Sequence, residues 1–159
     1  MEIYFLRHGD YQKKPGMKDA ECPLSEQGLS QMEREAISIA GLGLRLDLII
    51  TSPLVRARQT AEIIARPLRL PNAPLADDRL APGFDAGALA RILQEHAAAT
   101  GIMLVGHEPD FSRTISACTG GGRVECRKGS LARVDIGKPS PLEGVLAWLL
   151  PPDVLAPRI

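Results

Sequence analysis

The sequence predicts an α/β fold: a three-layer α/β/α sandwich with a mostly parallel central sheet and an antiparallel strand near the C-terminus. Two observations carry this prediction. Short continuous apolar runs, typical of parallel strands covered on both faces, alternate along the chain with amphipathic helical patterns. The C-terminal part then changes to the apolar-polar alternation of half-buried strands. Because 159 residues can bury one substantial core, we expect a single domain over residues 1–159.

Five segments are the expected strands. The apolar runs at residues 2–6 (EIYFL), 47–50 (DLII) and 102–106 (IMLVG) are predicted to be parallel and buried. In residues 131–136 (LARVDI) apolar and charged residues alternate, which indicates a half-buried strand. After a predicted turn, residues 145–150 (VLAWLL) form its antiparallel partner. The two prolines that follow are expected to end this strand, and the last residues to form a surface tail.

Two helices are expected on either side of the second strand. The first has an apolar stripe at helical spacing, with Ser25 as its N-cap and Gly41 near its end. The second is expected to follow Ser52 as N-cap, with Pro53 at the first helical position, where the missing N–H costs little. Both patterns predict one buried face.

Two further helices are expected around the third strand. Asp85 is the predicted N-cap of one, and His96 belongs to its apolar stripe, which favours a structural role for that histidine. The other is expected to start at Pro109 and to end near Gly120. The long, proline-rich and acidic connection over residues 71–85 is of the kind that tends to be functional.

The overall composition excludes several classes of function. Nineteen basic and nineteen acidic residues give no net charge, so no global field attracts nucleic acid or anionic membranes. No run approaches the roughly 20 apolar residues of a membrane span, and no signal peptide is visible. The cysteines at positions 22, 118 and 126 are odd in number and form no CxxC pair, which favours reduced thiols. We therefore expect a cytoplasmic protein with no nucleic-acid or membrane partner.

Basic and imidazole side chains follow three predicted strands at the points where they end. Arg7 and His8 follow the first, Arg56 lies in the first turn after the second, and His107 follows the third. The carboxyl ends of parallel strands meet at one edge of a sheet, where ligands collect and helix N-termini point. Arginine forks suit phosphoryl oxygens, so a tetrahedral anion is the expected ligand. Two histidines beside two arginines do not make a metal site, because zinc requires three or four ligands and arginines repel a dication.

Three motifs in this order resemble those of the histidine phosphatase superfamily, which has the phosphoglycerate mutase-like fold. They are LRHGD (6–10), SPLVRARQTAE (52–62) and LVGHEPDFS (104–112), and PLSEQG (23–28) is similar to the segment that opens the first helix in many members. The short chain looks most like the bacterial phosphohistidine phosphatases. The resemblance implies that His8 is the transiently phosphorylated nucleophile and that Arg7, Arg56 and His107 complete the phosphate pocket. It implies neither a metal nor an organic cofactor.

The general acid of this family is not obvious in the sequence. Many members carry a glutamate after the second motif, where this chain has Ala81-Pro82. Others use an aspartate directly after the second histidine, where this chain has Glu108, one methylene longer. Glu108 is therefore one candidate for the general acid. An equal alternative is that its carboxylate only complements the N-terminus of the following helix. Asp10 and the aspartates of residues 77–85 are the other candidates.

A weak general acid favours a substrate with a P–N bond, because imidazole is a far better leaving group than an alkoxide. A protein-borne phosphohistidine is the expected substrate, and Gly9 is expected to keep a side chain from crowding the backbone near the anion. A broad small-molecule phosphomonoesterase is one alternative, with a deep pocket lined by residues 71–85. A non-catalytic phosphate-binding module on the same fold is the other. The sequence does not identify the partner protein or the oligomeric state.

Overall fold

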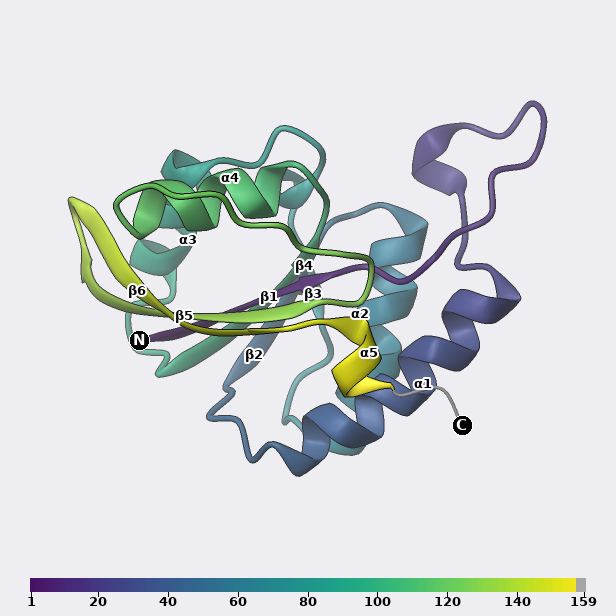
Figure 1. Cartoon of the computed structure of the whole chain (residues 1–159), viewed down its shortest axis with the longest axis horizontal. Coiled ribbons are helices and arrows are strands. Elements are labelled where there is room, and N and C mark those ends of the chain that lie inside the picture. Colours follow the sequence, from purple (N-terminus) through teal and green to yellow (C-terminus); the bar gives the residue numbers. More distant parts are fainter. Residues whose placement is uncertain (157–159) are drawn as a thin grey trace.

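The central sheet has six strands in the order β3-β2-β4-β1-β5-β6 in a computed structural model that describes residues 1–156 (Figure 1). The pairs β3–β2, β2–β4 and β4–β1 are parallel, and β5 is antiparallel to both β1 and β6. The predicted sandwich, with a mostly parallel sheet and an antiparallel C-terminal strand, is confirmed. The strands are β1 Glu2–Arg7, β2 Leu48–Thr51, β3 Leu75–Ala76, β4 Gly101–Gly106, β5 Leu131–Pro139 and β6 Leu142–Leu150.

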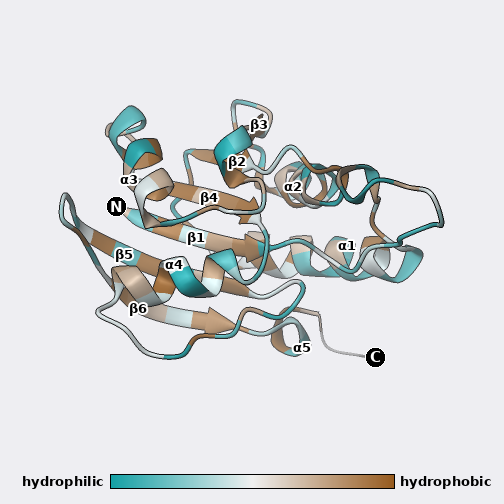
Figure 2. Cartoon of the chain, turned by 90° about the horizontal axis from the view of Figure 1, so that it is seen from above, coloured by the Kyte–Doolittle hydropathy of each residue, from teal (hydrophilic) through white to brown (hydrophobic). Residues whose placement is uncertain are grey.

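Helices cover both faces of the sheet, so there is one hydrophobic core on each face, and β1 contributes side chains to both. Its side chains alternate in direction, so Ile3 and Phe5 pack with α3 and α4, while Tyr4 and Leu6 pack with α1, α2 and α5. All four are fully buried. Figure 2 shows that the strands are mostly apolar, whereas the helices mix apolar and polar residues. The helices are α1 Glu26–Gly41, α2 Val55–Leu68, α3 Ala86–Glu95, α4 Asp110–Cys118 and α5 Pro152–Leu155, with 3₁₀ turns at η1 Asp19–Glu21 and η2 Asp78–Leu80.

Two of the predicted helix caps are confirmed and one is wrong. Ser25 accepts a hydrogen bond from the Gly28 amide at 3.0 Å, and Asp85 accepts one from Ala88 at 2.7 Å. The second helix, however, starts at Val55, and its N-cap Leu54 offers no side-chain bond. Leu54 has an extended backbone, so neither Ser52 as N-cap nor Pro53 as first helical residue is correct; the Ser52 hydroxyl instead accepts from the Leu54 amide at 3.3 Å and bonds to His107.

The C-terminal segment differs from the predicted surface tail. Residues 152–155 form the short helix α5, in which Leu155 is buried against the α1 face. Burial of the apolar Leu155 side chain in the core stabilises this segment in its position against α1. The rest of the predicted tail, residues 157–159, lies outside the described residues. The connection over residues 71–85 also contains regular structure, namely β3 and η2.

The loop after β1 is tied to the start of α1, and this explains part of the PLSEQG motif. Ser25 donates its hydroxyl to the Asp10 carboxylate at 2.8 Å, and its amide donates to the Asp10 carbonyl. A Cβ on Gly28 would lie 2.0 Å from that same carbonyl oxygen. Only glycine lets the first turn of α1 pack this closely against the loop that carries the RHG motif.

Three cysteines, at positions 22, 118 and 126, are buried free thiols. His96 is half-buried and ends α3 as its C-cap. None of the helices within the described part of the chain is both long and apolar enough to cross a membrane.

One buried carboxyl generates a prediction about stability. Glu35 of α1 is fully buried, and Gln31 donates to its Oε1 at 2.7 Å. Burial raises the pKa of Glu35 to about 8. The folded protein therefore holds a proton on Glu35 that the unfolded chain releases above about pH 4.3. Stability consequently falls as pH rises from that value through the folded pKa, and levels off above it.

We expect Glu35→Gln to stabilise the protein at pH 8 by an amount whose upper bound is about 5 kcal/mol, and much less near pH 4.5. Urea unfolding of both proteins across this pH range measures the difference. Glu33→Gln, an exposed site on the same helix, serves as the control. Unfolding free energies of Glu35→Gln and wild type that run parallel with pH would contradict the expected charge state.

Candidate active site

The four predicted phosphate ligands lie together at the carboxyl edge of the parallel strands. His8 and His107 come directly after β1 and β4, and their ring centroids are 5.0 Å apart. Arg56, in the first turn of α2, places its Nε 3.3 Å from His8 Nε2. His8, Arg56 and His107 are each at most 4% exposed. The convergence follows from topology, because parallel β1, β2 and β4 end side by side.

The hydrogen bonds of His8 determine which ring nitrogen is free to react. Nδ1 lies 2.7 Å from the carbonyl oxygen of Gly9, which can only accept, so Nδ1 carries the proton. Nε2 then holds the lone pair and accepts a hydrogen bond from the Arg56 Nε–H at 3.3 Å, which an approaching phosphoryl group has to displace. Burial, followed by the charges of His107, Arg56 and Arg7, lowers the pKa of His8 to about 3. The imidazole is neutral at physiological pH, with its lone pair directed at the guanidinium.

Gly9 has a packing role that differs from the predicted one. A Cβ at this position would lie 2.8 Å from the Met32 side chain and 3.2 Å from Leu24, both in the core. Glycine is therefore needed for contact with α1, and the expected crowding near the anion is not what the structure shows. The Gly9 amide donates to the Thr60 hydroxyl, which in turn donates to the carbonyl of Arg56. This chain of bonds joins the RHG loop to α2.

Each arginine is held by a segment far away in the sequence. Arg7 donates to the carbonyl of Cys126 at 3.0 Å, and its Nε is buried without a partner among the described residues. Its positive charge lowers the pKa of both His8 and His107. Arg56 donates to the carbonyl of Asp19 at 2.7 Å and pairs with its carboxylate at 3.0 Å. The turn η1 thus borders the site.

His107 is oriented by a residue at the end of β2. Its Nε2 lies 2.7 Å from the Ser52 hydroxyl, while its Nδ1 is buried and has no partner within the described chain. Burial first, and then the charge of Arg56, lower the pKa of His107 to about 4. A serine hydroxyl can donate or accept, so this contact fits both neutral tautomers of His107; the one in which Ser52 donates to Nε2 carries its proton on Nδ1, where it can donate to an oxyanion.

Tyr11 is a feature of the site that the sequence reasoning missed. Its ring packs edge-on against His8, with centroids 5.5 Å apart. The Arg56 guanidinium lies over the ring at 4.4 Å from the centroid, and the Lys128 ammonium at 5.0 Å. Cations over an aromatic face are attracted by its quadrupole, so Tyr11 helps to fix both side chains. The only sequence signal was an aromatic residue directly after LRHGD.

The nearest candidate general acids are engaged in local contacts. Glu108 accepts a hydrogen bond from the Ser112 amide at 3.1 Å, as a carboxylate that complements the start of α4 does. Asp10 pairs with Lys128 at 2.6 Å and accepts from Ser25. The hydrogen bond from Lys128 is the main cause that lowers the pKa of Asp10 below its ordinary value. A carboxyl with a lowered pKa is a poor proton donor at neutral pH.

Two of the three aspartates of residues 77–85 serve structural purposes, and the third is exposed. Asp77 is paired with Arg79 at 2.6 Å, Asp85 caps α3, and Asp78 is exposed in η2. A hollow of about 440 Å³ lined by residues 83–87 and part of α4 includes none of the four phosphate ligands. Across residues 1–156, no group of three His, Cys, Asp or Glu side chains could hold a metal ion.

Comparisons with known proteins agree with this geometry. The sequence model of the histidine phosphatase superfamily (branch 1) matches residues 3–81. An uncharacterized protein of Picosynechococcus is 38% identical over 120 residues, covering 74% of this chain and 72% of the relative. Phosphohistidine phosphatase SixA of Escherichia coli is 26% identical over 111 residues, covering 69% and 68%. A structure of the protein histidine phosphatase SixA complexed with tungstate superimposes with a TM-score of 0.86 at 22% identity, covering 96% of this chain and 97% of that one.

The burial of both imidazoles generates a prediction. We expect neither His8 nor His107 to gain a proton between about pH 5 and pH 8, because their pKa values are about 3 and about 4. ¹⁵N NMR of the side chains measures this directly, and His8 should show a protonated Nδ1 and an unprotonated Nε2 throughout. In the Arg56→Gln variant, loss of a neighbouring cation should raise both pKa values. A wild-type titration near pH 6.5 at either ring would show that the imidazoles are not desolvated.

Proposed function

The chain belongs to the histidine phosphatase superfamily, and from this we propose that it hydrolyses phosphohistidine on a phosphorylated protein through a transient phosphoryl group on His8. The observation that carries the proposal is the His8 tautomer. A proton held on Nδ1 by the Gly9 carbonyl leaves the Nε2 lone pair among two arginines and a second histidine. This arrangement suits in-line attack on phosphorus.

In the first step, the Nε2 lone pair of His8 forms a bond to phosphorus, and the bond from phosphorus to the leaving group breaks. The electron pair of the broken bond goes to the leaving group. Arg7, Arg56 and the Nδ1–H of His107 are placed to stabilise the negative charge on the phosphoryl oxygens. In the second step, water attacks phosphorus, the electron pair returns to Nε2, and the water protons leave on inorganic phosphate or to solvent.

The choice of substrate depends on how the leaving group obtains its proton. An alkoxide needs a proton from the enzyme as it leaves, whereas a phosphohistidine that is protonated on its other ring nitrogen leaves as neutral imidazole. Asp10, Asp77 and Asp85 are engaged by Lys128, by Arg79 and by the start of α3, Glu108 accepts one hydrogen bond from the Ser112 amide, and Asp78 is exposed in η2. A site without an obvious general acid favours substrates with a P–N bond over alkyl phosphate esters. The similarity to SixA, whose name gives phosphohistidine as its substrate, supports the same choice.

The proposed reaction also implies which cofactors, cellular location and partner to expect. The two steps need neither a metal nor an organic cofactor, because the phosphoryl charge is met by arginine and histidine side chains. We place the protein in the cytoplasm, on the basis of its balanced charge and its cysteine usage. The partner would be a protein that carries phosphohistidine at an accessible position.

The first experiment compares substrates in the presence of EDTA. We expect kcat/KM to be highest for a phosphohistidine protein, lower for an aryl phosphate and lowest for an alkyl phosphate, in the order of leaving-group basicity. His8→Ala should lose activity toward all three, and His96→Gln should retain it. Faster turnover of the alkyl ester would favour a small-molecule phosphomonoesterase. Ligand binding by wild type without turnover of any substrate would indicate a phosphate-binding module.

A second experiment tests the role of Glu108. If its carboxylate only complements the start of α4, Glu108→Gln should change kcat/KM for phosphohistidine less than about threefold and lower stability by about 0.5–1 kcal/mol. The dependence of rate on leaving-group pKa across a series of aryl phosphates should not steepen. A steeper dependence, with the largest loss for the most basic leaving group, would identify Glu108 as the general acid.

A further inference from the structure

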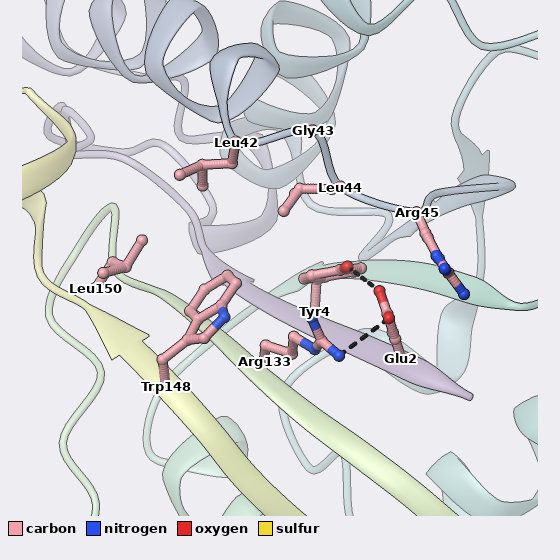
Figure 3. A pocket seen from close by; sticks show the side chains of 9 residues that line it. All are labelled: Glu2, Tyr4, Leu42, Gly43, Leu44, Arg45, Arg133, Trp148 and Leu150. Atoms are coloured by element: carbon pink, nitrogen blue, oxygen red, sulfur yellow. Dashed lines mark hydrogen bonds and ion pairs between the residues drawn. The ribbon is translucent and has the colours of Figure 1, made fainter.

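A second hollow lies at the opposite end of β1 from the candidate active site (Figure 3). It has a volume of about 670 Å³, within the usual range for small-molecule sites. Tyr4 lines the hollow. His8 lies four residues further along the chain, which at about 3.3 Å per residue of strand is about 13 Å away. The hollow is therefore separate from the proposed phosphate pocket.

One end of the hollow is apolar. The Trp148 indole packs on the Tyr4 ring, with centroids 6.1 Å apart and the planes tilted by 42°. Leu42, Leu44 and Leu150 surround it, and Leu42 is 43% exposed. No hydrogen bond joins the indole N–H to another residue of the hollow (Figure 3). An apolar surface with one unpaired donor at its edge suits a ligand with an apolar body and an acceptor group.

The other end of the hollow carries charged side chains, and Arg45 is the one among them that has no ion partner within the described part of the chain. Arg133 pairs with Glu2 at 3.0 Å and with Asp135 at 2.7 Å. Glu2 also accepts a hydrogen bond from the Tyr4 hydroxyl. Arg45, at the rim, is exposed and forms no ion pair with any described residue. The hollow therefore presents one unpaired guanidinium, that of Arg45, beside two carboxylates that share Arg133 (Figure 3).

We propose that this hollow binds a small organic molecule with an apolar body and one carboxylate. The body would lie against Trp148 and the three leucines, and the carboxylate would pair with the Arg45 fork. One unpaired guanidinium matches one negative charge, and the nearby Glu2 carboxylate disfavours a second. A phosphorylated substrate would carry too much negative charge for this position. Because the site is separate from His8, such a ligand would not compete with a phosphoryl substrate.

Trp148 is the one tryptophan of the chain, so intrinsic fluorescence reports directly on this hollow. The probe is 4-phenylbutyrate, and its neutral amide is the matched control ligand. We expect a saturable fluorescence change with the carboxylate, and binding of the amide that is weaker by at least about fivefold. The indole N–H resonance of Trp148 should shift in parallel.

Two variants test the charge match. Arg45→Gln should weaken binding of 4-phenylbutyrate by about five- to tenfold, since a charge-assisted hydrogen bond is lost. Arg91→Gln, an exposed arginine on α3, should leave it unchanged, and neither variant should alter phosphatase activity. Absence of saturable binding, equal affinity for the amide, or wild-type affinity in Arg45→Gln would each overturn the proposal. So would sedimentation data showing that a second copy of the chain buries Trp148.

Discussion

The hydrogen bond from His8 Nδ1 to the carbonyl of Gly9 is the interaction on which the rest of the site depends. It places the proton on one ring nitrogen and the lone pair on the other, where Arg56 faces it. Burial alone would keep the ring neutral, but it would not choose between the two nitrogens. The backbone bond makes that choice, and it therefore defines which atom is the nucleophile in the proposed reaction.

The fold serves mainly to hold this bond in place. Parallel β1, β2 and β4 end at one edge, which brings together residues that are up to about 100 positions apart in the chain. Gly28 lets α1 approach the loop after Asp10, and Thr60 ties the same loop to α2. Leaving a buried polar group without a partner destabilises the fold by more than its hydrogen bond stabilises it. Each of these contacts therefore favours a single arrangement of the loop.

The sequence predicted five strands, four helices and the convergence of Arg7, His8, Arg56 and His107 at one edge of the sheet, because apolar periodicity and strand ends are local signals; it missed β3 and α5. Tyr11, Asp19 and Lys128 were missed, since these contacts depend on how segments distant in the sequence come together: Tyr11 and Asp19 contact Arg56, and Lys128 contacts the Tyr11 ring. The start of α2 was misplaced because Leu54 keeps an extended backbone, and the Ser52 hydroxyl expected to cap the helix bonds to His107, 55 residues away. Gly9 was predicted to keep a side chain away from the anion, but a Cβ at this position would instead meet the Met32 side chain in the core.

The most direct measurement is the position of the phosphoryl group on a trapped phosphoenzyme. Rapid acid-free quenching followed by ³¹P–¹⁵N NMR of selectively labelled histidine identifies the phosphorylated nitrogen. Our account requires phosphorus on Nε2 of His8, with Nδ1 still protonated. Phosphorylation at Nδ1, or on any other side chain, would contradict it.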